Sequence, residues 1–167
     1  MADITLGGNK CKTIGQIPQK GTNAPDFTLA KPDLSTASLS DFRGKKVVLN
    51  IFPSVDTSVC ASSIREFNKR SADTDNTEVL CISRDLPFAQ QRFCGAEDIE
   101  NVTSLSDFKD GSFGKDYQLE IADGPFAGLH SRVVIILDED GKIIYTEQVG
   151  EIGDEPNYDA ALDALKN

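Results

Sequence analysis

The chain has 167 residues, 39% of them hydrophobic and 26% charged, which is the composition of one ordinary globular domain. Its 17 basic and 27 acidic side chains give a net charge of −10, and this charge disfavours binding to nucleic-acid phosphates or anionic lipid. No basic stretch followed by an apolar core opens the sequence, and no apolar run is long enough to cross a bilayer. We therefore expect a single cytoplasmic domain, residues 1–167, that binds neither nucleic acid nor membrane.

Apolar runs and turn residues predict strands and one helix in the first half of the chain. Strands are expected at 4–6, 10–13, 27–29 and 47–52. The first two form a β-hairpin around a glycine turn. The helix that follows the fourth strand starts near Cys60, because Ile64 and Phe67 stand three positions apart, as one apolar face of a helix requires.

The second half continues the alternation of strands and helices. A strand is predicted at 78–83, a hairpin from 132–137 and 142–146, and a last helix at 158–165. Asp85 is expected to cap a helix that carries Pro87 in its first turn and ends at Gly95. This order predicts an α/β fold in which a central mixed sheet is flanked by helices, with the N-terminal β-hairpin added.

Four cysteines, at positions 11, 60, 81 and 94, need an explanation. A disulfide scaffold is a poor one, because a domain of this size can bury a core without covalent cross-links. A zinc site is poorer, since no two cysteines have the short spacing of zinc ligands and His130 is the only histidine. The remaining interpretation is a reduced protein in which some cysteines carry out redox chemistry.

Cys60 has the position expected of a reactive thiol. It lies near the first turn of a helix that leaves a strand, where free N–H groups and the positive end of the helix dipole favour thiolate over thiol. The succession of strands and helices, with a cysteine at the first strand-to-helix junction, resembles the thioredoxin-like plan. The Cys-x-x-Cys of a disulfide carrier is missing, and Thr57-Ser58-Val59-Cys60 stands in its place.

Two motifs give the chain a resemblance to a known family. Pro53, Thr57 and Cys60 match the peroxiredoxin pattern Pro-x-x-x-Thr-x-x-Cys position for position. The stretch from Ser83 to Cys94, SRDLPFAQQRFC, resembles the signature of the bacterial thiol peroxidase subgroup. The similarity extends from the N-terminal hairpin to the closing helix.

The resemblance implies a thioredoxin-like domain that reduces hydrogen peroxide and organic hydroperoxides. In such proteins a sulfenic acid forms on the residue that matches Cys60, the residue that matches Cys94 resolves it as an intramolecular disulfide, and thioredoxin reduces that disulfide. The family's active-site arginine falls on Arg132, at the start of a late strand. No metal, flavin or haem is expected, and a homodimer is implied. Since Cys60 and Cys94 lie on different predicted helices, we expect local unwinding before they join.

The residues themselves account for the expected chemistry. At an ordinary thiol pKa of about 8.5 only a few per cent is ionised at pH 7, and lowering the pKa to about 6 takes about 3.4 kcal/mol. A helix terminus contributes about 0.3–1 kcal/mol, or about 2 in favourable settings, so a nearby cation is needed, and Arg132 is the candidate. The Thr57 hydroxyl can hold a peroxide oxygen. Pro53 has no N–H and a fixed φ, so it can shape the loop and shield the sulfur from water.

Plainer roles stay open for the cysteines. Cys60 and Cys94 could be structural side chains, Cys81 is most simply part of the core, and Cys11 in the hairpin is read as incidental. As whole functions, three alternatives remain: a disulfide oxidoreductase, a redox sensor that passes Cys60 oxidation to a partner, and a non-catalytic thioredoxin-fold binding module.

The other candidate residues also have plainer interpretations. Arg132 could form an ion pair with a carboxylate such as Asp56. The Thr57 hydroxyl could cap the following helix, a role compatible with peroxide binding. His130 is read as a loop histidine rather than a catalytic one.

Overall fold

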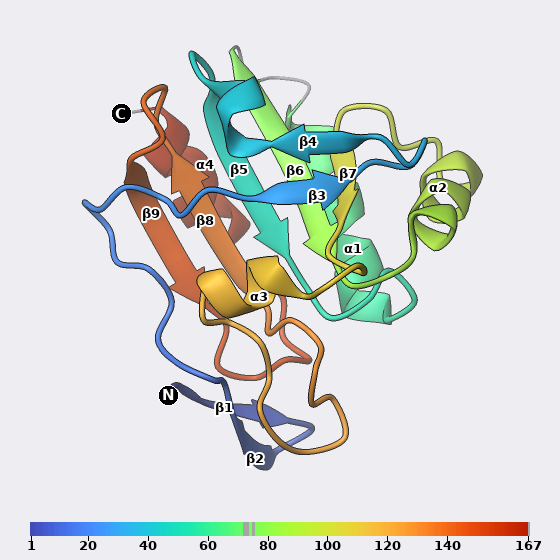
Figure 1. Ribbon diagram of the computed structural model, residues 1–167, viewed down its shortest axis with the longest axis vertical. Coiled ribbons are helices and arrows are strands. Elements are labelled where there is room, and N and C mark those ends of the chain that lie inside the picture. Colours follow the sequence, from blue (N-terminus) through green and yellow to red (C-terminus); the bar gives the residue numbers. More distant parts are fainter. Residues whose placement is uncertain (72–73, 75, 167) are drawn as a thin grey trace.

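A seven-stranded mixed sheet forms the centre of the computed structural model, which describes residues 1–71, 74 and 76–166 (Figure 1). The sheet order is β4-β3-β7-β6-β5-β8-β9, and β1 and β2 form a separate hairpin. The strands are β1 (Asp3–Leu6), β2 (Asn9–Lys12), β3 (Thr28–Ala30), β4 (Thr36–Ser38), β5 (Lys46–Ile51), β6 (Thr77–Ser83), β7 (Thr103–Ser106), β8 (Val133–Leu137) and β9 (Ile143–Gln148). The helices are the 3₁₀-helix η1 (Leu39–Phe42), α1 (Ser58–Ser71), α2 (Pro87–Ala96), α3 (Ser112–Asp116) and α4 (Tyr158–Leu165).

The strands in the middle of the sheet are parallel, and those on both sides are antiparallel. β6 pairs in parallel with β5 and β7, whereas β8 runs antiparallel to β5 and β9 antiparallel to β8. On the other side β3 is antiparallel to both β7 and β4. The central strands are covered on both faces, which agrees with their nearly continuous apolar sequences; every residue of β8 is buried.

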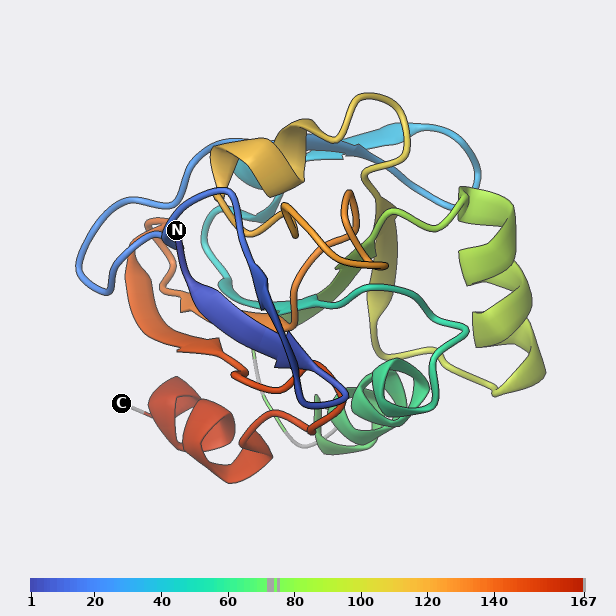
Figure 2. The same cartoon turned by 90° about the horizontal axis from the view of Figure 1, so that it is seen from below.

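Helices cover the two faces of the sheet unequally. α1 and α4 lie on one face and α3 on the other, while α2 stands beside β7 (Figures 1 and 2). The core between the sheet and α1 includes Ile64, Phe67 and Cys60, so the predicted apolar face of this helix is confirmed. The core on the opposite face includes Phe113 and Tyr117, whose rings stack at 4.3 Å.

Most elements predicted from the sequence are confirmed, with ends shifted by at most two residues. Four elements were not predicted: β4, η1, β7 and α3. β7 is informative, because its sequence TSLS contains a single large apolar residue. Its serines are buried at Ser104 and Ser106. A strand that buries hydroxyl groups lacks the apolar pattern on which the prediction depends.

Two details of α2 differ from the prediction. Leu86, not Asp85, is the N-cap residue, and no side chain caps the first turn. Pro87 at the first helical position has no N–H that would need a cap. Gly95 lies inside the helix, which ends at Ala96. The Asp85 carboxylate instead accepts hydrogen bonds from two donors in the loop that follows β5.

One carboxylate accepts several of the hydrogen bonds that attach the N-terminal hairpin to the rest of the fold. Glu151, after β9, accepts hydrogen bonds from the amides of Gly7, Gly8 and Gly153 at 3.2, 2.8 and 2.7 Å, and from the Thr5 hydroxyl at 3.0 Å. These bonds, that from Gly153 first, lower the pKa of Glu151 to about 2. The ionised carboxylate therefore stabilises the folded chain relative to the unfolded one.

Glu151→Gln is expected to lower the melting temperature at neutral pH. The substitution replaces one accepting oxygen with an N–H₂ group, which cannot accept hydrogen bonds from the surrounding donors. The contribution of the wild-type carboxylate is complete above the ordinary glutamate pKa of about 4.3 and is lost as the pH falls toward the folded-state value of about 2. Thermal unfolding across this pH range should show the gap between wild type and variant closing. Glu139→Gln, in the exposed β8–β9 turn, should follow wild type throughout. A gap for Glu151→Gln that is independent of pH would contradict the assignment.

Candidate active site

Cys60 lies in the first turn of α1, with its side chain fully buried between that helix and the sheet. Thr57 immediately precedes the helix, and its hydroxyl accepts a hydrogen bond from the Cys60 amide at 3.4 Å. This is the bond that a capping residue makes, so the helix begins where the sequence predicts. The sulfur therefore sits at the helix end that favours an anion.

Arg132 places a cation directly beside this sulfur. It precedes β8, is 2% exposed, and donates from Nη2 to Cys60 Sγ at 3.3 Å. Its Nε donates to the Ile152 carbonyl at 2.8 Å, which orients the guanidinium plane. Nη1 is buried and finds no hydrogen-bond partner among the described residues. The site therefore holds a cationic donor with unused hydrogen-bonding capacity next to the thiol.

The loop between β5 and α1, residues 53–57, forms another wall of the site. Pro53 is buried two residues after the end of β5. The Thr57 hydroxyl donates to the Ser54 carbonyl at 3.2 Å while it accepts from the Cys60 amide. A hydroxyl has one donor and two acceptor lone pairs, so one acceptor position of Thr57 stays unused. The Thr57 hydroxyl can therefore cap α1 and still offer a free acceptor position.

Asp85 holds this loop, a role that the sequence did not suggest. Its carboxylate accepts from the Ser54 hydroxyl at 2.7 Å, the Val55 amide at 2.8 Å and the Ser83 hydroxyl at 2.6 Å. An aspartate shortly before a proline-led helix matches the capping pattern, and nothing in that pattern points to partners about thirty positions earlier. The Ile152 carbonyl beside Arg132 was missed for another reason, because a main-chain acceptor leaves no trace in side-chain patterns.

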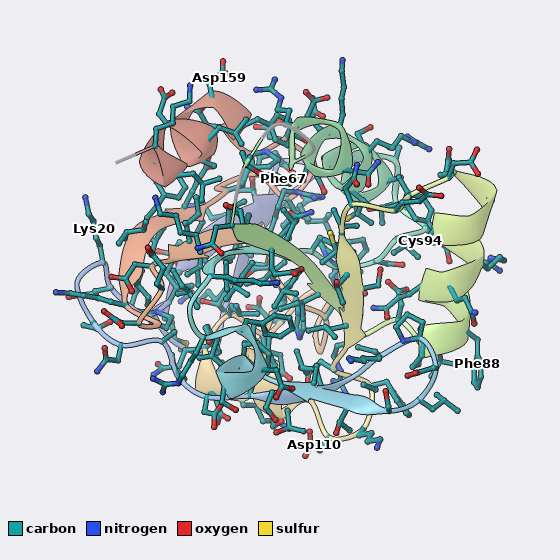
Figure 3. All side chains as sticks on the ribbon, turned by 90° about the horizontal axis from the view of Figure 1, so that it is seen from above. Lys20, Phe67, Phe88, Cys94, Asp110 and Asp159 are labelled. Carbon is teal, nitrogen blue, oxygen red and sulfur yellow. The ribbon has the colours of Figure 1, made fainter. Side chains whose placement is uncertain are left out.

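Cys94 is not brought together with Cys60. It is partly exposed on the side of α2 that faces β7, and its Sγ lies 3.4 Å from the Ser104 hydroxyl (Figure 3). All four cysteines are free thiols. Of the five residues predicted for the site, Thr57 and Arg132 therefore contact Cys60, Pro53 is buried in the loop before α1, and Cys94 contacts Ser104 instead.

The other two cysteines are buried in surroundings that keep a thiol protonated. Burial raises the pKa of Cys81 to about 12, although the Asn50 amide donates to its Sγ at 3.7 Å. Burial, followed by the charge of Asp123, also raises the pKa of the Cys11 thiol. Cys81 belongs to the core as the sequence suggests. Cys11 belongs to a small apolar cluster with Ile4 under the hairpin.

The ion pair considered between Arg132 and Asp56 does not form. Asp56 pairs with Arg92 of α2 at 3.2 Å, and both side chains are about two-thirds exposed. No carboxylate of residues 1–71, 74 and 76–166 forms an ion pair with Arg132. The guanidinium is thus left to interact with the sulfur.

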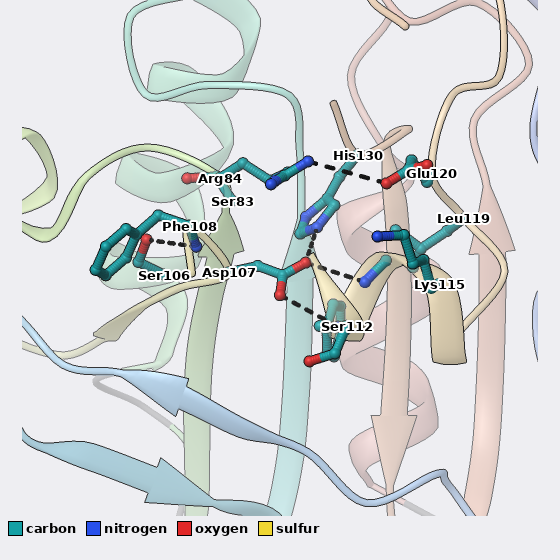
Figure 4. A network of polar contacts seen from close by, with 12 residues as sticks. Ser83, Arg84, Ser106, Asp107, Phe108, Ser112, Lys115, Leu119, Glu120 and His130 are labelled. Carbon is teal, nitrogen blue, oxygen red and sulfur yellow. Dashed lines mark hydrogen bonds and ion pairs between the residues drawn. The ribbon is translucent and has the colours of Figure 1, made fainter. Parts of the chain in front are cut away.

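His130 belongs to a separate network on the α3 side of the sheet (Figure 4). It is fully buried, and its Nε2 lies 2.8 Å from Asp107 Oδ2. Asp107 also accepts hydrogen bonds from the amides of Phe113 and Gly114, at 3.1 and 3.0 Å, and so fixes the start of α3. This geometry agrees with a structural histidine, although it is buried rather than in an open loop.

Two further features concern metal ligands and membrane crossing in the described part of the chain. No three His, Cys, Asp or Glu side chains there are grouped as a metal ion would require. None of its helices has both the length and the apolar character needed to cross a membrane.

Comparisons with known proteins agree with this geometry. Residues 19–162 match the family model described as Redoxin. Over 165 residues, 99% of each chain, the sequence is 58% identical to a thiol peroxidase of Mycobacterium tuberculosis and 53% identical to one of Corynebacterium glutamicum. The crystal structure of a peroxiredoxin-like protein from Aquifex aeolicus matches with a TM-score of 0.93 at 35% identity, over 98% of this chain and 95% of that one. The chain therefore belongs to the thiol peroxidases, a group of peroxiredoxins with the thioredoxin-like redoxin fold.

Proposed function

We propose that the chain is a thioredoxin-dependent peroxidase that reduces hydrogen peroxide and organic hydroperoxides through Cys60. The observation that carries the proposal is the 3.3 Å contact between Arg132 Nη2 and Cys60 Sγ, both of which are buried. A buried guanidinium requires a negative partner, and the Cys60 thiolate is within reach. The likeness to thiol peroxidases supports the same activity.

In the first step the Cys60 thiolate attacks the hydroxyl oxygen of the peroxide. The O–O bond breaks, the attacked oxygen stays on sulfur with its proton as a sulfenic acid, and the other oxygen leaves as an anion that takes up a proton. Nη1 of Arg132, which has no partner among the described residues, can donate to the leaving oxygen as its charge grows. The free acceptor position of Thr57 can bind the peroxide O–H.

Ionisation of the thiol is only part of the expected acceleration. For any thiol, lowering the pKa from about 8.5 to about 6 raises the thiolate fraction roughly thirtyfold at pH 7. The same change weakens the nucleophile by about tenfold if the Brønsted slope of about 0.4–0.5 for thiol exchange applies. Binding of the peroxide oxygens and stabilisation of the charge on the leaving one must therefore contribute the larger share.

In the second step Cys94 resolves the sulfenic acid. The sulfenic acid of Cys60 and the thiol of Cys94 condense to an intramolecular disulfide with release of water, and the dithiol of thioredoxin then reduces this disulfide by exchange. Cys60 is buried beside Arg132, whereas Cys94 faces Ser104 of β7. Local unwinding of α1, α2 or both must therefore precede disulfide formation.

A homodimer is part of the proposal. Leu86 and Phe88, at the start of α2, are 53% and 62% exposed, and Phe88 projects away from the sheet (Figure 3). Two large apolar side chains exposed within one short stretch offer a surface that a second copy of the chain can cover.

Cys60→Ser is expected to abolish peroxide reduction and leave the fold intact, because serine is nearly isosteric with cysteine. Cys11→Ser and Cys81→Ser are matched controls, and both should keep wild-type turnover, since each native thiol stays protonated. Steady-state peroxide consumption with a thioredoxin system measures all three variants. Activity of Cys60→Ser above about one hundredth of wild type would contradict the assignment.

Arg132→Ala should slow the reaction of Cys60 with peroxide by roughly a hundredfold, the range found when one transition-state donor is removed. The loss should persist at alkaline pH, where the thiol is fully ionised, because the guanidinium also serves the leaving oxygen. The measurement is the rate constant of Cys60 oxidation against pH. Arg92→Ala is the control, since its exposed pair with Asp56 contributes little. Recovery of the wild-type rate at high pH would limit Arg132 to a role in ionisation.

Peroxide-treated wild type should contain an intramolecular Cys60–Cys94 disulfide, detected by non-reducing peptide mapping. Amide exchange across 57–66 or 86–95 should be faster than in the reduced protein. In Cys94→Ser the first oxidation should keep its rate, but the sulfenic acid should over-oxidise and thioredoxin-dependent cycling should fall sharply. A disulfide between two chains, or one from Cys60 to Cys81, would disprove this mechanism.

A further inference from the structure

Asp85 joins two parts of the molecule that the proposed reaction uses in turn. One is the loop 53–57 before the reactive cysteine, and the other is α2, which carries Cys94. The Asp85 carboxylate accepts hydrogen bonds from the Ser54 hydroxyl at 2.7 Å and the Val55 amide at 2.8 Å, so two donors attach the loop to it. Because Asp85 stands directly before the N-cap residue of α2, it ties the loop to the start of that helix.

The same residue is fastened to the sheet. Ser83, at the end of β6, donates to the Asp85 carboxylate at 2.6 Å, and the hydroxyl of Ser106 in β7 donates to the Asp85 carbonyl. Gln90 of α2 is 1% exposed and donates from Nε2 to the Ser83 hydroxyl at 3.2 Å and to the Leu105 carbonyl at 2.9 Å. The loop, the start of α2 and the ends of β6 and β7 thus share one hydrogen-bonded cluster.

The far end of α2 is attached differently. Glu97 forms an ion pair with Arg65 of α1 at 2.5 Å, with side chains 36% and 47% exposed, Phe93 packs against the core under α1, and the Cys94 Sγ lies 3.4 Å from the Ser104 hydroxyl. Exposed ion pairs stabilise a fold little, whereas hydrogen bonds to a charged group are stronger than those between neutral groups. The polar contacts at the start of α2 are therefore stronger than those at its far end.

A short chain of contacts leads from Asp85 to the reacting sulfur. Asp85 holds Ser54, and the Ser54 carbonyl accepts hydrogen bonds from both the amide and the hydroxyl of Thr57, each at 3.2 Å. Thr57 in turn accepts from the Cys60 amide. A shift of the loop away from Asp85 would therefore displace the Thr57 hydroxyl from the position proposed for peroxide binding.

We propose that Asp85 is a positioning residue with opposite effects on the two steps. It holds the loop in the arrangement in which Cys60 reacts rapidly with peroxide. The same bonds hold the start of α2, so they slow the opening through which Cys94 reaches the sulfenic acid. This inference rests on the proposed peroxidase function, and it names the contact that sets the balance between disulfide formation and over-oxidation.

The test is a single-turnover reaction of wild type and Asp85→Asn with hydrogen peroxide, quenched at intervals with a thiol-alkylating reagent. Mass spectrometry of the Cys60 and Cys94 peptides follows sulfenic acid and disulfide formation separately. We expect the first step to be about fivefold slower and the second about fivefold faster, each about 1 kcal/mol at 1.36 kcal/mol per tenfold. The Val55 amide, which loses its carboxylate acceptor, should exchange faster with solvent.

Two measurements separate positioning from simpler effects. Loss of a negative charge near the sulfur would favour the thiolate and would not slow the first step. A general loss of stability would speed amide exchange throughout the chain, whereas loss of positioning should confine faster exchange to the loop 53–57 and the start of α2. Asp98→Asn is the matched control, because Asp98 is exposed just beyond α2 and has a φ of 53°, a conformation that asparagine adopts readily. Both of its rate constants should stay within about twofold of wild type.

Ser54→Ala provides a second variant if Asp85→Asn does not fold. It removes one donor to the carboxylate and should change both steps in the same directions by smaller factors. Rate constants of Asp85→Asn, or of Ser54→Ala in its place, that both equal those of wild type would overturn the inference. So would two steps that slow together. Wild-type Cys60 that does not react with peroxide would instead refute the proposed function, and this inference with it.

Discussion

A guanidinium buried beside a thiol constrains the rest of the site. Arg132 is 2% exposed, and no carboxylate of the described residues pairs with it. Removing such a charge from water costs several kcal/mol unless a negative group compensates for it. The groups that Arg132 contacts are the Cys60 sulfur, 3.3 Å from Nη2, and the Ile152 carbonyl, 2.8 Å from Nε. A main-chain acceptor therefore helps to fix the guanidinium beside the sulfur.

Two thiols in the same core have different hydrogen-bonding partners. Cys60 and Cys81 both lie in the apolar core between the sheet and α1. Cys81 receives a weak amide contact from Asn50, and burial raises its pKa to about 12. Cys60 receives a guanidinium instead. The two thiols therefore meet different groups in the same core, an amide at Cys81 and a guanidinium from the residue before β8 at Cys60.

The proposed reaction makes two demands that conflict. Attack on a peroxide requires Thr57 and Arg132 to be held rigidly around Cys60, because misplacement of the reacting groups is costly. Resolution requires the helices that carry Cys60 and Cys94 to come apart from their present contacts. The cluster around Asp85 lies where these demands meet, since it supports the loop and the start of α2 together. A strong cluster favours the first step, and a weak one favours the second.

The sequence by itself determined the local features of the site. The strand before residue 53, the start of α1 at Thr57 and the place of Cys60 in its first turn follow from patterns within a dozen residues, because helix caps and dipoles act over that range. Family resemblance added Arg132 and Cys94. Only the tertiary structure decided that Arg132 reaches the sulfur, that Asp85 binds the loop instead of capping a helix, and that Cys94 faces β7. Those contacts join residues far apart in the chain, and the order of strands and the packing of helices decide which donor meets which acceptor.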